Sequence, residues 1–148
     1  PVLVAALGPQ ALRVTGRLAD GTILAWVGPK TISDHIAPTL NEAAANAGRP
    51  TPQIVASLPV CVTDNEADVR ARIGKGFGMC GQLPSCRAMF DREGVEGPAD
   101  VAIVGSSAQV GDGIEAMRSA GVTEFSPTEF FTNPEEAVRT RELLVSLL

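Results

Sequence analysis

The sequence predicts an α/β fold, a (βα)4 half of a TIM (β/α)8 barrel, from three observations. Short apolar segments alternate with longer segments of helical periodicity, which is typical of a parallel sheet with right-handed crossovers. Glycine or proline stands at most boundaries between them. The strand–helix pair occurs four times, half the number in a complete barrel. We therefore expect residues 1–148 to form a single partial domain, either a fragment of a longer chain or a half that self-associates.

The first unit contains the best candidate site. Val2–Ala6 is a short apolar run that predicts a buried parallel strand, and Pro9 suits the first turn of the following helix. Thr22–Trp26 is the next strand. Between the first strand and the helix, Leu7 and Gly8 form a turn whose backbone N–H groups can bind a phosphate, because ligands of α/β proteins bind at the carboxyl ends of strands. The alternative is a tight turn that only requires a small residue.

The second helix and the third strand follow with clear boundaries. Helical spacing begins at Thr31 or Ser33 and continues to Ala47. The third strand is Ile54–Val62, where Pro59 predicts a bulge or an early end of pairing.

The third helix begins at Thr63 or Asp64 and weakens in a glycine-rich stretch over residues 74–81. A second short helix over residues 84–92 makes a helical insertion before the fourth unit.

The last part of the chain contains one ambiguous segment. Val101–Val104 fits either a short strand or the end of a helix. A helix over residues 105–121 precedes the fourth strand, Val122–Phe125. Residues 127–133 read as an irregular loop, and Pro134–Leu148 as the final helix.

Composition limits the classes of partner. The net charge is −5, the pI is about 4.8 and tyrosine is absent, which argues against binding of nucleic acid or anionic membranes. No apolar run reaches the ~20 residues needed to span a bilayer, and no signal peptide is seen. Three cysteines without a CxxC pair favour a reducing, cytoplasmic setting.

Catalytic and metal-binding residues are not predicted. His35 is the only histidine, and one turn into a helix it reads as a solvated residue. One histidine and three scattered cysteines make neither a catalytic triad nor a metal site. Cys61 lies in an apolar run and reads as a small core residue.

Two further positions are candidates for binding an anion. Gly28-Pro29-Lys30 follows the second strand, but it lacks the upstream glycine of a P-loop. Arg87, in the short helix after the glycine-rich stretch, can bring another positive charge toward an anionic cofactor. For both Lys30 and Arg87 the alternative is a solvated surface side chain.

Several motifs resemble one known family. AALGP at residues 5–9, GRLADGTI at 16–23 and WVGPKT at 26–31 resemble the phosphate-binding segment of the luciferase-like monooxygenase superfamily. The nearest branch is the F420-dependent oxidoreductases of actinobacteria. Later motifs resemble the same branch in the same order: LPVCVTD, GQLPSCRAMFDREG, VAIVG and SAGVTEF. The resemblance covers nearly the whole chain but only the C-terminal half of a usual family member.

The resemblance implies a function and a set of cofactor-binding residues. It implies hydride transfer with coenzyme F420, or with FMN, the other coenzyme of the superfamily. It implies a phosphate site at Leu7, Gly8, Gly28 and Lys30, and it favours a helix at Val101–Val104. The substrate pocket and the catalytic acid or base of the family lie mostly in the N-terminal half, so this chain is expected to supply only the phosphate end.

The sequence alone is compatible with several other functions, and it predicts a partner. The alternatives are a non-catalytic half-barrel that serves binding or assembly, a flavin-dependent monooxygenase, and a doubly wound phosphate-binding domain. Four strands cannot close a barrel, and the first and last strands would keep unpaired edges. We therefore expect a second half-barrel or a homodimer as partner.

Overall fold

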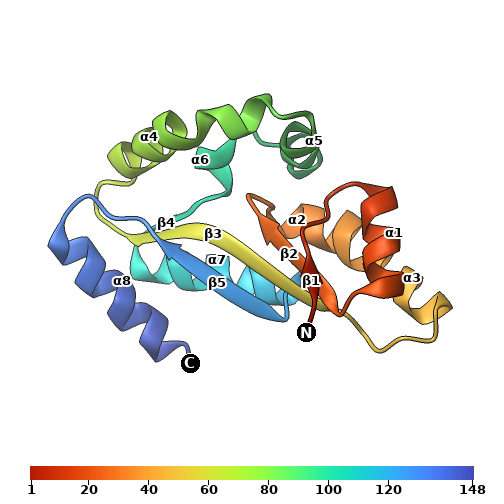
Figure 1. Ribbon diagram of the computed structural model, residues 1–148. Coiled ribbons are helices and arrows are strands. Elements are labelled where there is room, and N and C mark those ends of the chain that lie inside the picture. The colour runs from red at the N-terminus through yellow and green to blue at the C-terminus, as the bar shows by residue number, and fades with distance from the viewer.

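The computed structural model describes all 148 residues. One sheet of five parallel strands forms the centre of the fold (Figure 1). Its strands are β1 (Leu3–Val4), β2 (Gly21–Ala25), β3 (Gln53–Val62), β4 (Ile103–Gly105) and β5 (Glu124–Glu129). The parallel sheet confirms the predicted α/β class.

Helices connect these strands throughout. Between β1 and β3 they are α1 (Pro9–Leu18), α2 (Pro29–Thr31), the π-helical turn η1 (Ile32–Ile36) and α3 (Ala37–Asn46). The insertion after β3 contains α4 (Glu66–Phe77), the 3-10 turn η2 (Gly78–Gln82), α5 (Pro84–Glu93) and α6 (Pro98–Val101). The chain closes with α7 (Ser107–Ser119) and α8 (Pro134–Ser146).

Strand β3 is the central strand and pairs with three others. Its Gln53 N–H donates toward β2, to Asp20 O, and the N–H of Thr63 just after it donates to Gly105 O of β4. Odd-numbered residues of β3 therefore direct their backbone groups to this edge, where pairing with β2 ends opposite Ser57 and pairing with β4 begins opposite Val60. Pro59 falls in the gap between the two strands, where its missing N–H costs no ladder bond. The predicted bulge is absent, since β3 is continuous and pairs with β5 through Pro59, but pairing on the edge toward β2 and β4 does stop at Pro59.

The helix prediction for Val101–Val104 is also wrong. Helix α6 ends at Val101, and the next residues form β4, in which Val104 pairs with Cys61 of β3. The β-branched pair Ile103 and Val104 suits this short strand. The insertion between the third and fourth units thus carries a strand of its own, and the sheet has five strands rather than four.

The predicted loop over residues 127–133 begins too early. Strand β5 continues through Pro127 and Thr128 to Glu129, which pairs with Val60. Pro127 is tolerated because β5 pairs on one side only and forms an edge of the sheet.

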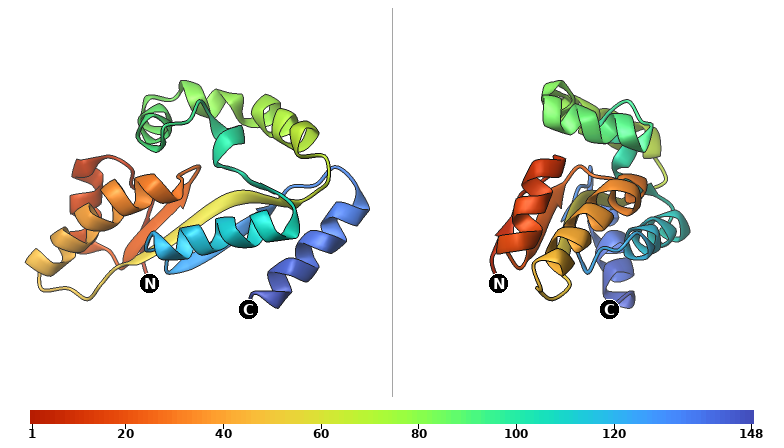
Figure 2. Two further views of the ribbon diagram at one scale, coloured as in Figure 1. Left: turned by 180° about the vertical axis from the view of Figure 1, so that it is seen from behind. Right: turned by 90° about the vertical axis from the view of Figure 1, so that its right-hand side faces the viewer.

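The two faces of the sheet have different environments. Ile54, Ala56 and Leu58 of β3 belong to the main core, together with Leu12 and Leu40 of the helices. Figure 2 shows α3 and α7 lying on this side of the sheet. On the opposite face Ile23 is 45% exposed and Ser57 bonds to Thr128 at 3.0 Å. In a closed barrel this second face would be the interior.

The insertion lies across the carboxyl ends of the strands, above the sheet in Figure 1. Arg70 of α4 fixes it in place, because its guanidinium donates to the carbonyl oxygens of Ala99, Ala102 and Val104. The insertion therefore covers the end of the sheet at which a ligand of an α/β protein binds.

Candidate functional site

The turn between β1 and α1 presents backbone N–H groups that the protein does not use. Gly8 is the N-cap residue of α1, and its carbonyl accepts only from the N–H of Leu12. No side chain caps this helix and its first turn has no acidic residue. The N–H groups of Gly8, Gln10 and Ala11 therefore have no acceptor within the chain. No heavy atom lies within 4 Å of a Cβ built on Gly8, so the turn is open to an anion.

His35 lies behind this turn and is not solvated, which corrects the expectation from the sequence. Its ring is buried, with 7% of the residue exposed, and Nε2 lies 2.9 Å from the carbonyl oxygen of Leu7. The sequence could not reveal this contact, because 28 residues separate the two partners.

The turn between β2 and α2 already holds a carboxylate. Glu93 of α5 accepts from the N–H of Lys30 at 3.1 Å and from the N–H and hydroxyl of Thr31, each at 2.7 Å. A Cβ placed on Gly28 would collide with the same carboxylate. Glycine at this position thus allows Glu93 to cap the helix from another part of the chain. A phosphate on this turn would compete with Glu93.

The side chains of Lys30 and Arg87 bond to α5 and the loop after it. Lys30 Nζ donates to the Arg92 carbonyl at 3.2 Å and remains exposed. Arg87 pairs with Asp91 at 2.8 Å and donates to the carbonyls that follow α5, those of Val95 and Glu96. Both cationic side chains thus bond around α5: Arg87 belongs to this helix, and Lys30 reaches it from α2. Leu7 and Gly8 form a separate turn.

An aromatic cluster at the carboxyl ends of the strands was not predicted. Trp26 follows β2 with a backbone φ of 61°, the only non-glycine residue with positive φ. Its ring lies 4.8 Å from that of Phe77 in α4, which lies 6.4 Å from that of Phe130. A large residue in the left-handed region is strained and is often found at ligand sites. The available sequence signal was the lone tryptophan between a strand and Gly28.

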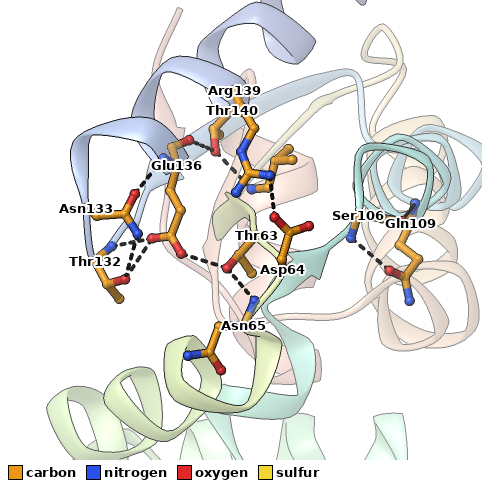
Figure 3. A network of polar contacts seen from close by, with 11 residues as sticks. Thr63, Asp64, Asn65, Ser106, Gln109, Thr132, Asn133, Glu136, Arg139 and Thr140 are labelled. Carbon is orange, nitrogen blue, oxygen red and sulfur yellow. Dashed lines mark hydrogen bonds and ion pairs between the residues drawn. The ribbon is translucent and has the colours of Figure 1, made fainter.

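A polar network fixes the carboxyl end of β3 to the start of α8 (Figure 3). Glu136, only 2% exposed, accepts from the Thr63 hydroxyl at 2.7 Å and from the N–H and hydroxyl of Thr132. Burial alone would raise the pKa of Glu136, but these hydrogen bonds outweigh it and the pKa is lowered. Both carboxylate oxygens are engaged, so the network serves to hold β3 and α8 together.

Cys61 is buried beside this network and is a core residue, as predicted. Burial raises the pKa of its thiol to about 11, and the Glu136 carboxylate adds to the shift. The thiol is therefore neutral and unreactive near pH 7.

No group of three His, Cys, Asp or Glu side chains is placed to hold a metal ion. No helix has both the length and the apolar character needed to cross a membrane.

Comparison with known proteins decides the family. The model of the family described as luciferase-like monooxygenase matches residues 1–124, most of the chain. The chain belongs to this luciferase-like family. No curated protein matches its sequence.

Solved structures show which luciferase-like folds the chain resembles. A coenzyme F420-dependent tetrahydromethanopterin reductase from Methanopyrus kandleri aligns with a TM-score of 0.73 at 21% identity, over 97% of this chain and 48% of that one. An F420-dependent secondary alcohol dehydrogenase aligns with a TM-score of 0.74 at 15% identity, over 100% and 49%. The oxygenating constituent of an FMN-bound Baeyer–Villiger monooxygenase from Pseudomonas putida aligns with a TM-score of 0.61 at 19% identity, over 97% and 46%.

Nearly the whole chain aligns with these structures, but each of them is about twice as long. The chain spans about half the length of the luciferase-like chains that it matches. Its parallel sheet and helices therefore correspond to half of a luciferase-like barrel, which confirms the predicted half-barrel fold.

Proposed function

We propose that this chain is the phosphate-binding half of an F420-dependent oxidoreductase, and that it holds the cofactor phosphate at the turn of Leu7 and Gly8. The observation that carries the proposal is this uncapped turn at the carboxyl end of β1, with three N–H groups free and open space around Gly8. Free N–H groups at the positive end of a helix suit the negative charge of a phosphate group.

The deazaflavin would supply hydride chemistry, and this chain would bind and orient it. Gly8 would bind the phosphate through its N–H, and the first turn of α1 would add its dipole. The insertion α4–α6 would limit access of water to this end of the barrel. Substrate contacts would come from the other half of the barrel.

Coenzyme F420 is the first choice and FMN the second. Support for F420 comes from the sequence motifs and from the two F420-dependent structures, which align with the higher TM-scores quoted above. Support for FMN comes from the FMN-bound monooxygenase structure. A flavin-dependent monooxygenase is therefore the second candidate function.

A titration tests the proposal. The chain is titrated with F420 and with FMN, and binding is followed by cofactor fluorescence and by the emission of Trp26, the only tryptophan. We expect saturable binding that competes with inorganic phosphate. If neither cofactor binds to the chain alone or to a full barrel, the proposal is wrong, and a non-catalytic assembly module becomes the better interpretation.

The partner of the half-barrel is part of the same proposal. Strands β1 and β5 each pair on one side only, and the face of the sheet that carries Ile23 is open. A second half-barrel, either an N-terminal half or another copy of this chain, would cover both. Light scattering of the isolated chain tests this: a dimer supports self-association, and a dilute, sharply melting monomer contradicts it.

A further inference from the structure

We infer that His35 is a positioning residue of the phosphate site: its Nε2 holds the Leu7 carbonyl, and this hydrogen bond aims the Gly8 N–H at the phosphate. The inference rests on the proposed function of the β1–α1 turn. It adds a role for the only histidine of the chain, a residue that does not itself touch the cofactor.

The contact defines which ring nitrogen carries the proton. The Nε2 of His35 lies 2.9 Å from the Leu7 carbonyl oxygen, in a setting where the residue is 7% exposed. A carbonyl oxygen only accepts, so the ring must donate from Nε2–H. Removal of the donor would leave this partly buried carbonyl without its partner.

The hydrogen bond also sets the direction of the next N–H. The chain has no cis peptide bond, so the Leu7 C=O and the Gly8 N–H point in opposite directions across one planar unit. With the C=O held toward His35 in η1, the N–H points away from η1. A peptide turned by 180° would present an oxygen to the phosphate in place of a donor.

Such a constraint matters at this turn because little else holds it. No heavy atom lies within 4 Å of a Cβ built on Gly8, and glycine rotates more freely than any other residue. Pro9 restricts the backbone only on the C-terminal side of Gly8, and not at the Leu7–Gly8 peptide. The bond from His35 is the one side-chain hydrogen bond to the Leu7–Gly8 peptide.

The sequence explains why His35 lies on a widened helical turn. Pro38 has no N–H to donate to the Asp34 carbonyl, as a regular helix would require. The N–H of the preceding residue, Ala37, donates to Ile32 O, five residues back rather than four, which makes η1 a π-helical turn. Ile32 and Ile36 on either side are fully buried, so the turn is anchored in the core.

Two substitutions test the inference. His35→Leu removes the donor, and His35→Gln keeps one, since its amide nitrogen can reach the same carbonyl. We expect His35→Leu to weaken F420 or FMN binding about threefold to tenfold, the effect of one hydrogen bond, and His35→Gln to restore most of it. The amide resonance of Gly8 should shift on addition of inorganic phosphate in wild type and in His35→Gln, and much less in His35→Leu.

The outcomes separate this inference from the proposed function. If wild type binds neither cofactor, both fail. If wild type binds and folded His35→Leu binds equally well with the same Gly8 shift, only the role of His35 is overturned. If His35→Leu does not fold, nitrogen spectra of the wild-type imidazole decide: a proton on Nε2 with rescue by His35→Gln supports the inference, and a ring protonated only at Nδ1 overturns it.

Discussion

Replacement of Glu93 tests how the chain closes its second βα turn. The Glu93 carboxylate accepts three hydrogen bonds at the start of α2, one from Lys30 at 3.1 Å and two from Thr31 at 2.7 Å. It therefore acts as the N-cap of a helix from 62 residues away. Removal of an N-cap costs about 0.5–2 kcal/mol of stability.

The two substitutions at Glu93 differ in what they remove. Glu93→Gln keeps one acceptor oxygen and loses the negative charge at the helix N-terminus, so we expect a loss of about 1 kcal/mol. Glu93→Ala removes all three hydrogen bonds as well as the tie between α5 and α2, so we expect about 2 kcal/mol.

Urea denaturation followed by circular dichroism measures both losses. Glu96→Gln is the matched control: Glu96 is exposed, and its carboxylate makes no hydrogen bond, so its midpoint should not move. Equal midpoints for wild type, Glu93→Gln and Glu93→Ala would refute the capping argument.

The same variants locate the phosphate. If the cofactor binds at Gly8 alone, Glu93→Gln should leave its affinity unchanged. If the phosphate also uses the N–H of Lys30, it must displace Glu93, and Glu93→Gln should then raise the affinity.

Four further predictions concern the site and the fold. Gly8→Val should block approach of the phosphate and lower cofactor affinity, with little change in melting temperature because nothing surrounds its Cβ. Lys30→Ala should weaken binding only if this side chain turns to the phosphate, and rising salt should then shrink the difference from wild type. Gly16→Ala should destabilise the chain by about 1–2 kcal/mol, because the new Cβ would lie 2.5 Å from the Leu40 carbonyl oxygen where α1 crosses α3. The lowered pKa of Glu136 implies that its stabilisation is present above the ordinary carboxyl pKa and is lost as the pH falls through the folded value.

Each of these predictions has its own control or contrary result. Unchanged cofactor affinity in Gly8→Val would show that the phosphate does not bind at this turn. Equal cofactor affinities of wild type and Lys30→Ala at low salt would show that Lys30 does not contact the phosphate. Gly111→Ala in α7 is the control for Gly16, since no atom lies near its Cβ and the helix should gain about 1 kcal/mol. Denaturation between pH 7 and pH 3 tests Glu136, and Glu136→Gln should flatten the acid side of that profile.

Local signals in the sequence were enough for most elements. Pro9 and Pro134 stand at the first turns of α1 and α8, and Gly94 ends α5 with a φ of 83°. These residues act through their own backbone, so the sequence reveals them directly.

The errors came where distant residues decide the structure. The four residues Val101–Val104 suit a helix or a strand equally, and only pairing with Cys61 and its neighbours makes β4. His35 looked solvated because its partner Leu7 is 28 residues away. The sequence hides the role of Glu93 for the same reason, because a carboxylate at the end of one helix gives no sign that it caps another.

These distant contacts make two similar turns unequal. The turns after β1 and β2 share the pattern of a glycine and then a proline at the start of a helix, and from the sequence both suit a phosphate. The structure closes the second turn with the carboxylate of Glu93 and leaves the first one open, with the peptide before Gly8 held by His35. A phosphate would have to displace a negative charge at the second turn and nothing at the first. We therefore expect a cofactor phosphate that binds this chain to prefer the first turn, and the affinity of Glu93→Gln for the cofactor measures that preference.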